Sequence, residues 1–347
     1  MGRVYLDHNA TAPLRPEARA AMIAAMDVVG NPSSVHAEGR AAKALVEAAR
    51  EQVARALGGE GAEIVFTSSA TEAAALALRG RGLHGAAVEH DAVAAWVDDS
   101  LPVDANGFVT IAAPDSSTLQ LANSETGVLQ TLPEALAVSD MTQAFGKVPV
   151  DFLASGALMG VVSAHKLGGP KGVGALVLRR GLDLDPVLKG GGQEMGRRAG
   201  TENVIGIAGF GAAAEAAVRD VAEGRWTETE EFRNILESSI AALAKETIFV
   251  GKSVPRLPNT SCFAVPGWKG ETQVMQMDLA GVAISAGSAC SSGKVRPSRV
   301  LTAMGYDEAT AKSAIRVSLG LETTKQEVER FAEAWGAAYK RFRAKAA

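Results

Sequence analysis

A lysine within a short polar turn is the first feature of this chain that suggests chemistry. The segment Ser163-Ala164-His165-Lys166 follows an apolar stretch and leads into the turn sequence LGGPKG. A lysine amine attacks an aldehyde only when it is deprotonated, and partial burial lowers its pKa toward that state. Ser163 and His165 offer hydrogen-bonding groups that suit a phosphate. A lone lysine of this kind is more often a solvated residue beside a turn. Other residues of the chain must therefore show whether Lys166 is a reactive amine.

Three other polar positions fit a flat ring that carries a phosphate. Asp140 follows an apolar stretch, where its carboxylate either pairs with a protonated ring nitrogen or remains solvated. The segment 69–72 (SATE) lies between an expected strand and an expected helix. Its N–H groups and the Thr71 hydroxyl form either a phosphate site or a plain capping box. His90 lies where a strand meets a helix, and a histidine there stacks on a ring, moves protons or fills a loop.

The two cysteines have different settings. Cys290 lies in the sequence GSACSSG, among small residues that leave a thiol exposed as a nucleophile requires. Cys262 lies in the apolar sequence SCFAV and is predicted to be a buried, inert residue. Neither cysteine belongs to a CxxC or CxxH cluster, so we expect no metal site. Two cysteines also make no disulfide framework, which suits the reducing cytoplasm.

An arginine in an apolar segment is the last candidate. Arg316 lies in the sequence IRVSLG, which is expected to be a buried strand. An arginine in such a place needs a carboxylate partner. That partner is either an acidic side chain of the protein or the carboxylate of a substrate.

The elements that position these residues alternate between helix and strand, which indicates an α/β protein. The expected helices span residues 39–57, 73–78, 201–221, 227–244, 273–280 and 325–342. The expected strands span residues 63–67, 118–121, 148–150, 161–162, 174–178, 261–265, 282–285 and 314–318. We predict a large domain at 13–247 and a smaller α+β domain made of 1–12 and 248–347, which carries the Cys290 loop.

The composition excludes several classes of protein. The chain has 347 residues, of which 47% are hydrophobic, and this is enough for two domains with buried cores. A net charge of −4 gives no attraction to nucleic acid or to an anionic membrane. The first ten residues lack an apolar signal segment, and no apolar run reaches the roughly 18 residues of a membrane span. We therefore expect a cytoplasmic protein.

Ten motifs in order resemble those of the cysteine desulfurases, a group within the class V aminotransferase family. They are YLDHNATAP (5–13), GNPSS (30–34), SSATE (68–72), VEH (88–90), DMTQAFGK (140–147), AHKLGGPKG (164–172), GGGQE (190–194), RAGT (198–201), GSACSS (287–292) and IRVSLG (315–320). The resemblance covers nearly the whole chain. It implies a homodimer of the fold type I of pyridoxal-phosphate (PLP) transferases. In that fold the large domain has a mostly parallel seven-stranded sheet, and the smaller domain is α+β.

The resemblance also implies roles for single residues. Lys166 resembles the lysine that holds PLP, Asp140 the partner of the ring nitrogen, and Cys290 the cysteine that accepts sulfur. The other implied cofactor contacts are Ala70, Thr71, His90, Gln143, Ser163, His165, Ser124 and, across the dimer interface, Thr201. The implied substrate contacts are Arg316, Asn31 and Ser124, and the implied catalytic residues are Cys290, Lys166 and His90.

The implied reaction removes sulfur from L-cysteine, giving L-alanine and a persulfide on Cys290. The GSAC motif on a long polar loop is similar to the group that serves iron–sulfur cluster assembly and tRNA thiolation, so the implied partner is a sulfur acceptor such as a cluster scaffold. No membrane and no direct nucleic-acid partner are expected. Two alternatives stay open: another PLP reaction of the family, such as selenocysteine lysis or transamination, and a non-catalytic scaffold that retains the fold.

The sequence departs from the family at several places. Ser124 stands where the family usually has an asparagine that contacts the cofactor or the substrate carboxylate. We expect water or Asn123 to take over that contact. The segments 90–123 and 127–140 also look short, each having lost much of a helix, which changes the surface available to partners.

Overall fold

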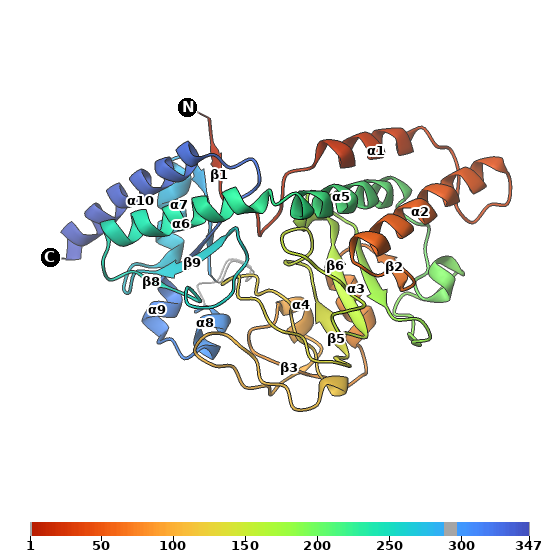
Figure 1. Cartoon of the computed structure of the whole chain (residues 1–347), viewed down its shortest axis with the longest axis horizontal. Coiled ribbons are helices and arrows are strands. Elements are labelled where there is room, and N and C mark those ends of the chain that lie inside the picture. Colours follow the sequence, from red (N-terminus) through yellow and green to blue (C-terminus); the bar gives the residue numbers. More distant parts are fainter. Residues whose placement is uncertain (1, 288–296, 347) are drawn as a thin grey trace.

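The computed structural model describes residues 2–287 and 297–346, which form two lobes (Figure 1). Cys290, the predicted sulfur acceptor, lies outside the described residues. Strand β1 (Val4–Tyr5) and helix α10 (Lys325–Ala346), near the two ends of the chain, belong to the same lobe. No helix within 2–287 and 297–346 combines the length and the apolar character needed to cross a bilayer.

The first lobe contains a sheet that is mostly parallel, as predicted. Strands β2 (Glu63–Thr67), β7 (Gly174–Leu178), β6 (Met159–Ser163) and β5 (Val138–Asp140) lie side by side in that order. Parallel bridges through Thr118 and Ser117 connect β5 to β3 (His84–Gly85), which pairs in parallel with β4 (Asp98–Asp99). Counting the bridged segment, seven described segments form the sheet, and β7 alone runs antiparallel to its neighbours.

Two predicted strands are much reduced. Residues 118–121 contribute only the bridge at Thr118, and 148–150 only a bridge between Val148 and Phe145. Pro149 has no N–H to donate to a ladder, which explains the second case. The connections also contain the short 3₁₀ turns η1 (Pro114–Ser116), η2 (Ala164–Lys166) and η3 (Gln193–Gly196).

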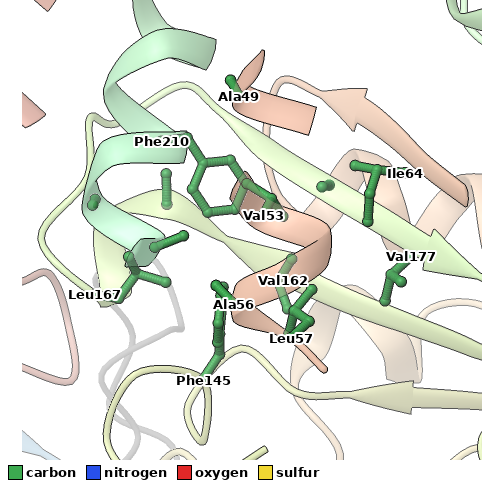
Figure 2. Close-up of a cluster of buried hydrophobic side chains, with 14 of the residues drawn as sticks. Ala49, Val53, Ala56, Leu57, Ile64, Phe145, Val162, Leu167, Val177 and Phe210 are labelled. Atoms are coloured by element: carbon green, nitrogen blue, oxygen red, sulfur yellow. The ribbon is translucent and has the colours of Figure 1, made fainter. Parts of the chain in front are cut away.

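Helices α1 (Pro16–Met26), α2 (Ala37–Ala56) and α5 (Val204–Ala222) pack together on one face of this sheet. Buried residues of α2 recur every three or four positions (Ala42, Val46, Ala49, Val53), which is the spacing of a single helix face. Figure 2 shows Phe210 of α5 beside Val53, above the sheet. A Cβ at Gly211 would lie 2.8 Å from the Cα of Ala49, so only glycine allows α2 and α5 to approach this closely.

Helices α3 (Ala70–Leu78) and α4 (Asp91–Ala94) form a second core with the sheet. The buried part of α3 consists mainly of alanine and leucine and packs against β6 and β7. The four residues of α4 are all the α-helix found between residues 90 and 123. The sheet is therefore covered on both faces, as a mostly parallel sheet requires.

The second lobe is built on the antiparallel sheet β11 (Ser285–Ala286), β12 (Ala314–Ser318), β9 (Thr260–Ala264) and β8 (Ile248–Phe249). Around it lie α6 (Trp226–Leu243), α7 (Gly270–Leu279), α8 (Arg299–Ala303), α9 (Glu308–Ser313) and α10. Its core holds buried aromatic residues, among them Trp335, Trp268 and Phe263. Leu236 and Ile240 of α6 join this core. The domain boundary at 247 stays a prediction, and the packing of α6 favours an earlier one.

The N-terminal segment joins the second lobe. Strand β1 pairs in parallel with β10 (Val282–Ala283), and Asp7 bridges Ser318 at the end of β12. The Asn9 backbone N–H then donates to the Ser318 hydroxyl over 2.9 Å. These contacts bring the following residues to the boundary between the two lobes, where polar side chains collect.

Candidate active site

A pocket of about 460 Å³ lies between the two lobes. The first lobe contributes the ends of β5 and β6 and the start of α3, and the second contributes Ser285 and Arg316. Ligands of open α/β sheets bind beyond the carboxyl ends of the strands, which is the position of this pocket. The pocket contains most of the predicted site residues: Ala70, Thr71, His90, Ser124, Asp140, Gln143, Ser163, His165, Lys166 and Arg316.

Lys166 ends the η2 turn that follows β6 directly. Its Nζ donates to the backbone oxygens of Asn9 (2.6 Å) and Ala10 (2.9 Å). The amine is therefore held from the N-terminal segment, while its backbone is held by the sheet. This places a nucleophilic amine on the pocket wall with its position fixed from two sides.

His165, next to Lys166, is neutral in this setting. Burial and the nearby Lys166 lower the pKa of its imidazole to about 4. Its Nδ1 is 3.2 Å from the Thr11 hydroxyl. A neutral ring contributes a hydrogen bond to an anion without adding charge.

Asp140 and His90 both line the pocket but come from different elements. Asp140 is the last residue of β5, and His90 caps the start of α4. The Asp140 Oδ1 accepts the Thr142 N–H over 2.9 Å, which fixes the carboxylate. The His90 Nδ1 accepts the Ala92 N–H over 3.1 Å, so the neutral ring carries its proton on Nε2. The two residues offer an anion and a planar ring to the same pocket.

The start of α3 forms the phosphate-sized end of the pocket. The Ser69 hydroxyl caps the helix by accepting the Glu72 N–H over 3.2 Å. The N–H groups of Ala70 and Thr71 belong to the first turn, where the helix dipole attracts an anion. Strand β7 passes directly beneath, and a Cβ at Gly174 would lie 2.5 Å from the Ser69 carbonyl carbon. Glycine is therefore required for this turn to lie so close to the sheet.

Arg316 lies in the middle of β12 and is buried. Its Nη2 pairs with the Asp7 Oδ1 at 2.9 Å, and its Nη1 donates to the Ser124 backbone oxygen at 2.9 Å. The acidic partner expected from the sequence is thus Asp7, which also accepts from the Ser285 hydroxyl over 2.8 Å. The Arg316 Nε is buried without a partner among the described residues. The guanidinium therefore has one N–H donor that no described residue satisfies.

Ser124 lines the pocket, and Arg316 contacts its backbone rather than its side chain. Of the two replacements expected for that contact, water and Asn123, the Asn123 side chain is already engaged elsewhere. The Asn123 Oδ1 accepts the N–H groups of Glu125 and Thr126, and its Nδ2 donates to the Val88 oxygen. These bonds fix a buried turn, and both lone pairs of the Asn123 Oδ1 are used in it.

Two predicted residues lie away from the pocket of this single chain. Asn31 is exposed, and its Oδ1 accepts the Ser33 N–H over 2.9 Å. Thr201 lines a separate small hollow beside Glu194 and Arg198. The resemblance placed Thr201 at the site of a second copy, so its role stays a prediction, as does that of Asn31.

Several residues of the site were not identified from the sequence. Asn9, Asp7 and Gln120 line the pocket, and Lys147 is buried behind it. The motifs that contain Asn9, Asp7 and Lys147 were recognised, but nothing in their spacing pointed to a role.

Two carboxyl groups near the pocket, those of Glu89 and Glu125, have raised pKa values. Burial, followed by the nearby Asp140, raises the pKa of Glu89 to about 8, although its Oε1 accepts the Gln120 N–H over 2.8 Å. Burial also raises the pKa of Glu125 to about 7, and its Oε2 accepts the Ser298 hydroxyl over 2.5 Å. Glu89 is therefore largely protonated in neutral solution, and Glu125 in slightly acidic solution.

Cys262 lies in β9 and is fully buried. Burial raises the pKa of its thiol far above the ordinary value, and the nearby Glu125 adds to this. A thiol in this state supplies almost no thiolate at neutral pH. The structure thus agrees with the prediction that Cys262 is chemically inert.

The family model for class-V aminotransferases matches residues 4–95 and 117–331, so the chain belongs to that family. Its relatives within the family include cysteine desulfurases. The cysteine desulfurase of Cereibacter sphaeroides is 40% identical over 370 aligned residues, which cover 96% of this chain and 95% of the relative. The cysteine desulfurase NifS of Azotobacter vinelandii is 37% identical, covering 95% of this chain and 91% of the relative.

A solved structure extends this similarity to the fold. The NifS-like protein from Rickettsia africae superposes with a TM-score of 0.89 at 32% identity, covering 97% of this chain and 99% of that one. The fold is therefore that of the NifS-like proteins, as the sequence predicted.

Proposed function

We propose that this chain is a cysteine desulfurase that uses PLP to remove sulfur from L-cysteine. The observation that supports this most is the convergence of Lys166, Asp140 and the α3 N-terminus on one pocket. An amine, an anion and a phosphate site at separate ends of one cavity match the aldehyde, ring nitrogen and phosphate of PLP. Two other features also suit a phosphate. Gly174, which has no Cβ, allows the turn at Ser69 to lie close to the sheet, and the His165 ring is neutral.

The chemistry supplied by bound PLP is withdrawal of electrons from the substrate α-carbon. Lys166 would hold the cofactor, Asp140 would keep its ring nitrogen protonated, and His90 would lie against the ring. Gln143 would donate to the ring oxygen. Ala70, Thr71, Ser163 and His165 would bind the phosphate, and Thr201 of a second copy would complete that site.

The residues of the chain perform the remaining steps. Arg316 binds the L-cysteine carboxylate, and Ser124 lies beside it. The Lys166 amine would act as the base that takes the α-proton. The Cys290 thiolate attacks the substrate sulfur, so an S–S bond forms while the C–S bond breaks and its electron pair stays on carbon. Protonation of that carbon fragment gives alanine, and His90 would move a proton to or from sulfur through its Nε2.

The persulfide on Cys290 is proposed to pass to an acceptor such as an iron–sulfur cluster scaffold or a tRNA-thiolation protein in the cytoplasm. The protein named SspA, solved in complex with cysteine, has the same fold, with a TM-score of 0.76 at 28% identity over 92% of this chain and 100% of that one. That complex supports L-cysteine as the substrate. A homodimer is proposed because the Gly-rich segment 190–201 carries the exposed Met195 and Thr201.

The test is incubation with L-cysteine and a thiol reductant, measuring alanine and sulfide together. Equal amounts of both products support desulfuration, whereas products formed only from selenocysteine or by amino transfer favour the other class V reactions. A protein without a visible absorption band after PLP addition would instead be a scaffold. A gain of one sulfur on the Cys290 peptide, seen by mass spectrometry without reductant, tests the acceptor.

Matched serine variants sharpen the assignment of the acceptor. Cys290→Ser should retain the visible band but form no persulfide and almost no alanine. Cys262→Ser should keep both, with some loss of stability from the buried hydroxyl. Sulfur found only on Cys262 would contradict the assignment.

A further inference from the structure

A buried lysine lies behind the pocket, in the turn that follows Gln143. Lys147 is only 3% exposed, and within 2–287 and 297–346 no acidic side chain forms an ion pair with it. Lysine is rarely this buried unless it is paired. Burial lowers the pKa of Lys147 well below its ordinary value, and the nearby Lys166 and Arg316 lower it further. The cost of placing an amine here indicates a role that an apolar residue could not perform.

The Lys147 amine donates to two side-chain oxygens. Its Nζ lies 2.6 Å from the Gln143 Oε1 and 2.9 Å from the Asn9 Oδ1. Two N–H groups are enough for these contacts, and both the neutral and the charged amine supply them. Both protonation states of Lys147 therefore supply these two donors, although only the charged amine lacks a lone pair that could accept a hydrogen bond instead.

The first contact determines which end of the Gln143 amide faces the pocket. With Oε1 turned to Lys147, the NH₂ group donates to the Asn9 backbone oxygen over 3.0 Å. An amide has two N–H groups, so one remains for a group in the pocket that Gln143 lines. A flipped amide would place N–H against the Lys147 donors and would leave the Asn9 oxygen facing the amide oxygen.

The second contact fixes the residue that holds Lys166. The Asn9 side chain is bound on both sides: Oδ1 also accepts from Asn259 Nδ2 over 3.1 Å, and Nδ2 donates to the Thr260 hydroxyl over 2.8 Å. The Asn9 backbone oxygen receives Lys166 Nζ as well as the Gln143 amide. One buried amine therefore supports two groups that reach the pocket.

We propose that Lys147 is a positioning residue for the cofactor: it orients the Gln143 amide so that an N–H donates to the ring oxygen of PLP, and it holds Asn9 so that the Asn9 carbonyl receives the Lys166 amine. This inference rests on the proposed function for the identity of the ring. It adds the element behind the pocket that fixes the direction of the Gln143 hydrogen bond.

The test compares Lys147→Met, which keeps an apolar stem, with Lys171→Met, an exposed lysine eight residues past the β6 end whose removal is the matched control. The readouts are the dissociation constant of PLP for the apo-protein and the wavelength and pH midpoint of the visible band. Lys147→Met should weaken PLP binding about tenfold, the effect of losing one well-placed hydrogen bond. It should also shift the band and its midpoint, whereas Lys171→Met should change neither the wavelength nor the affinity by more than about twofold.

A double variant separates positioning from general destabilisation. If Lys147 acts through Gln143, then Lys147→Met should add little in a Gln143→Leu background, because the oriented amide is already absent. Lys147→Gln, which keeps an N–H donor, should recover part of the affinity and remain folded if the methionine variant does not. Fully additive effects, or a normal band in both Lys147 variants, would overturn the proposal. A wild-type chain that forms no visible band with PLP would instead refute the proposed function.

Discussion

The two walls of the pocket are fixed by different kinds of interaction. On the wall of the large sheet, Asp140 and Ser163 are the last residues of β5 and β6, so backbone hydrogen bonds place them. On the wall of the second lobe, Arg316 is held by the Asp7 carboxylate and the Ser124 oxygen. The first wall is expected to tolerate changes of side chain without losing its shape. The second wall depends on one charge pair, so cofactor binding and substrate binding should respond to different mutations.

The largest effect is expected on the cofactor wall at Lys166. Lys166→Ala removes the amine that attaches the cofactor, so the visible band of bound PLP should disappear and turnover should fall at least about 1,000-fold. Absorbance and alanine release measure the two effects. Lys171→Ala, an exposed lysine on the same turn, should leave both unchanged within about twofold. Normal turnover by the Lys166 variant would show that Lys166 does not attach the cofactor, and the contrast between a cofactor wall and a substrate wall would then fail.

The next effect is expected at Asp140. Asp140→Asn removes the charge that would keep the ring nitrogen protonated, so kcat should fall about 100-fold with little change in the KM for L-cysteine. The backbone position should persist because β5 sets it. Asp151→Asn, an exposed cap of the following turn, provides the control. A rise in KM without loss of kcat would place Asp140 on the substrate side.

Arg316→Lys should have the opposite kinetic signature. A lysine retains the charge but loses the two-sided contact with Asp7 and Ser124, so the KM for L-cysteine should rise about tenfold. PLP affinity and the visible band should stay as in the wild type. Steady-state kinetics and PLP titration measure these separately. Equal losses of PLP and cysteine affinity would mean that the two walls are not independent.

The smallest effect concerns Glu89, which borders the cofactor wall. Its pKa is about 8 in the folded protein, against 4.5 for the ordinary group. Between these values the folded chain keeps a proton that the unfolded chain releases, so this contribution to stability is lost as pH rises toward 8. Going from pH 5.5 to 8, the wild type should lose about 2–3 kcal/mol more unfolding free energy than Glu89→Gln.

Urea unfolding at the two pH values measures the Glu89 effect. Glu134→Gln, at an exposed position, should behave as the wild type does. The same pH slope in the Glu89 variant would contradict a buried, protonated carboxyl at this site.

Much of the cofactor wall could be predicted because it depends on local sequence. Strands 63–67 and 174–178 of the large sheet have the predicted bounds, since continuous apolar runs bounded by turn residues define them. Lys166 and Asp140 lie at strand ends, where the motifs placed them.

The second wall and the supporting residues could not be predicted in the same way. The Asp7–Arg316 pair joins residues 309 positions apart, and Lys147 meets Asn9 across 138 positions. Nothing in the local pattern selects one such pair over another. The loss of the 148–150 strand has a local cause, Pro149, which its apolar neighbours obscured. Asn31 and Thr201 lie away from the pocket, and their roles as a substrate contact and a contact across the dimer interface stay predictions.

The N-terminal segment has a consequence for biosynthesis. Asn9 supplies a carbonyl to Lys166, yet Asn9 is itself held by Ser318, Asn259 and Thr260. A ribosome completes residue 9 long before residue 318, so the earliest part of the chain must wait for one of the latest. Such long-range closure is slow and costs entropy before any contact compensates for it. The lysine site is therefore expected to form only as synthesis ends, which delays any productive encounter with the cofactor until the whole protein can fold around it.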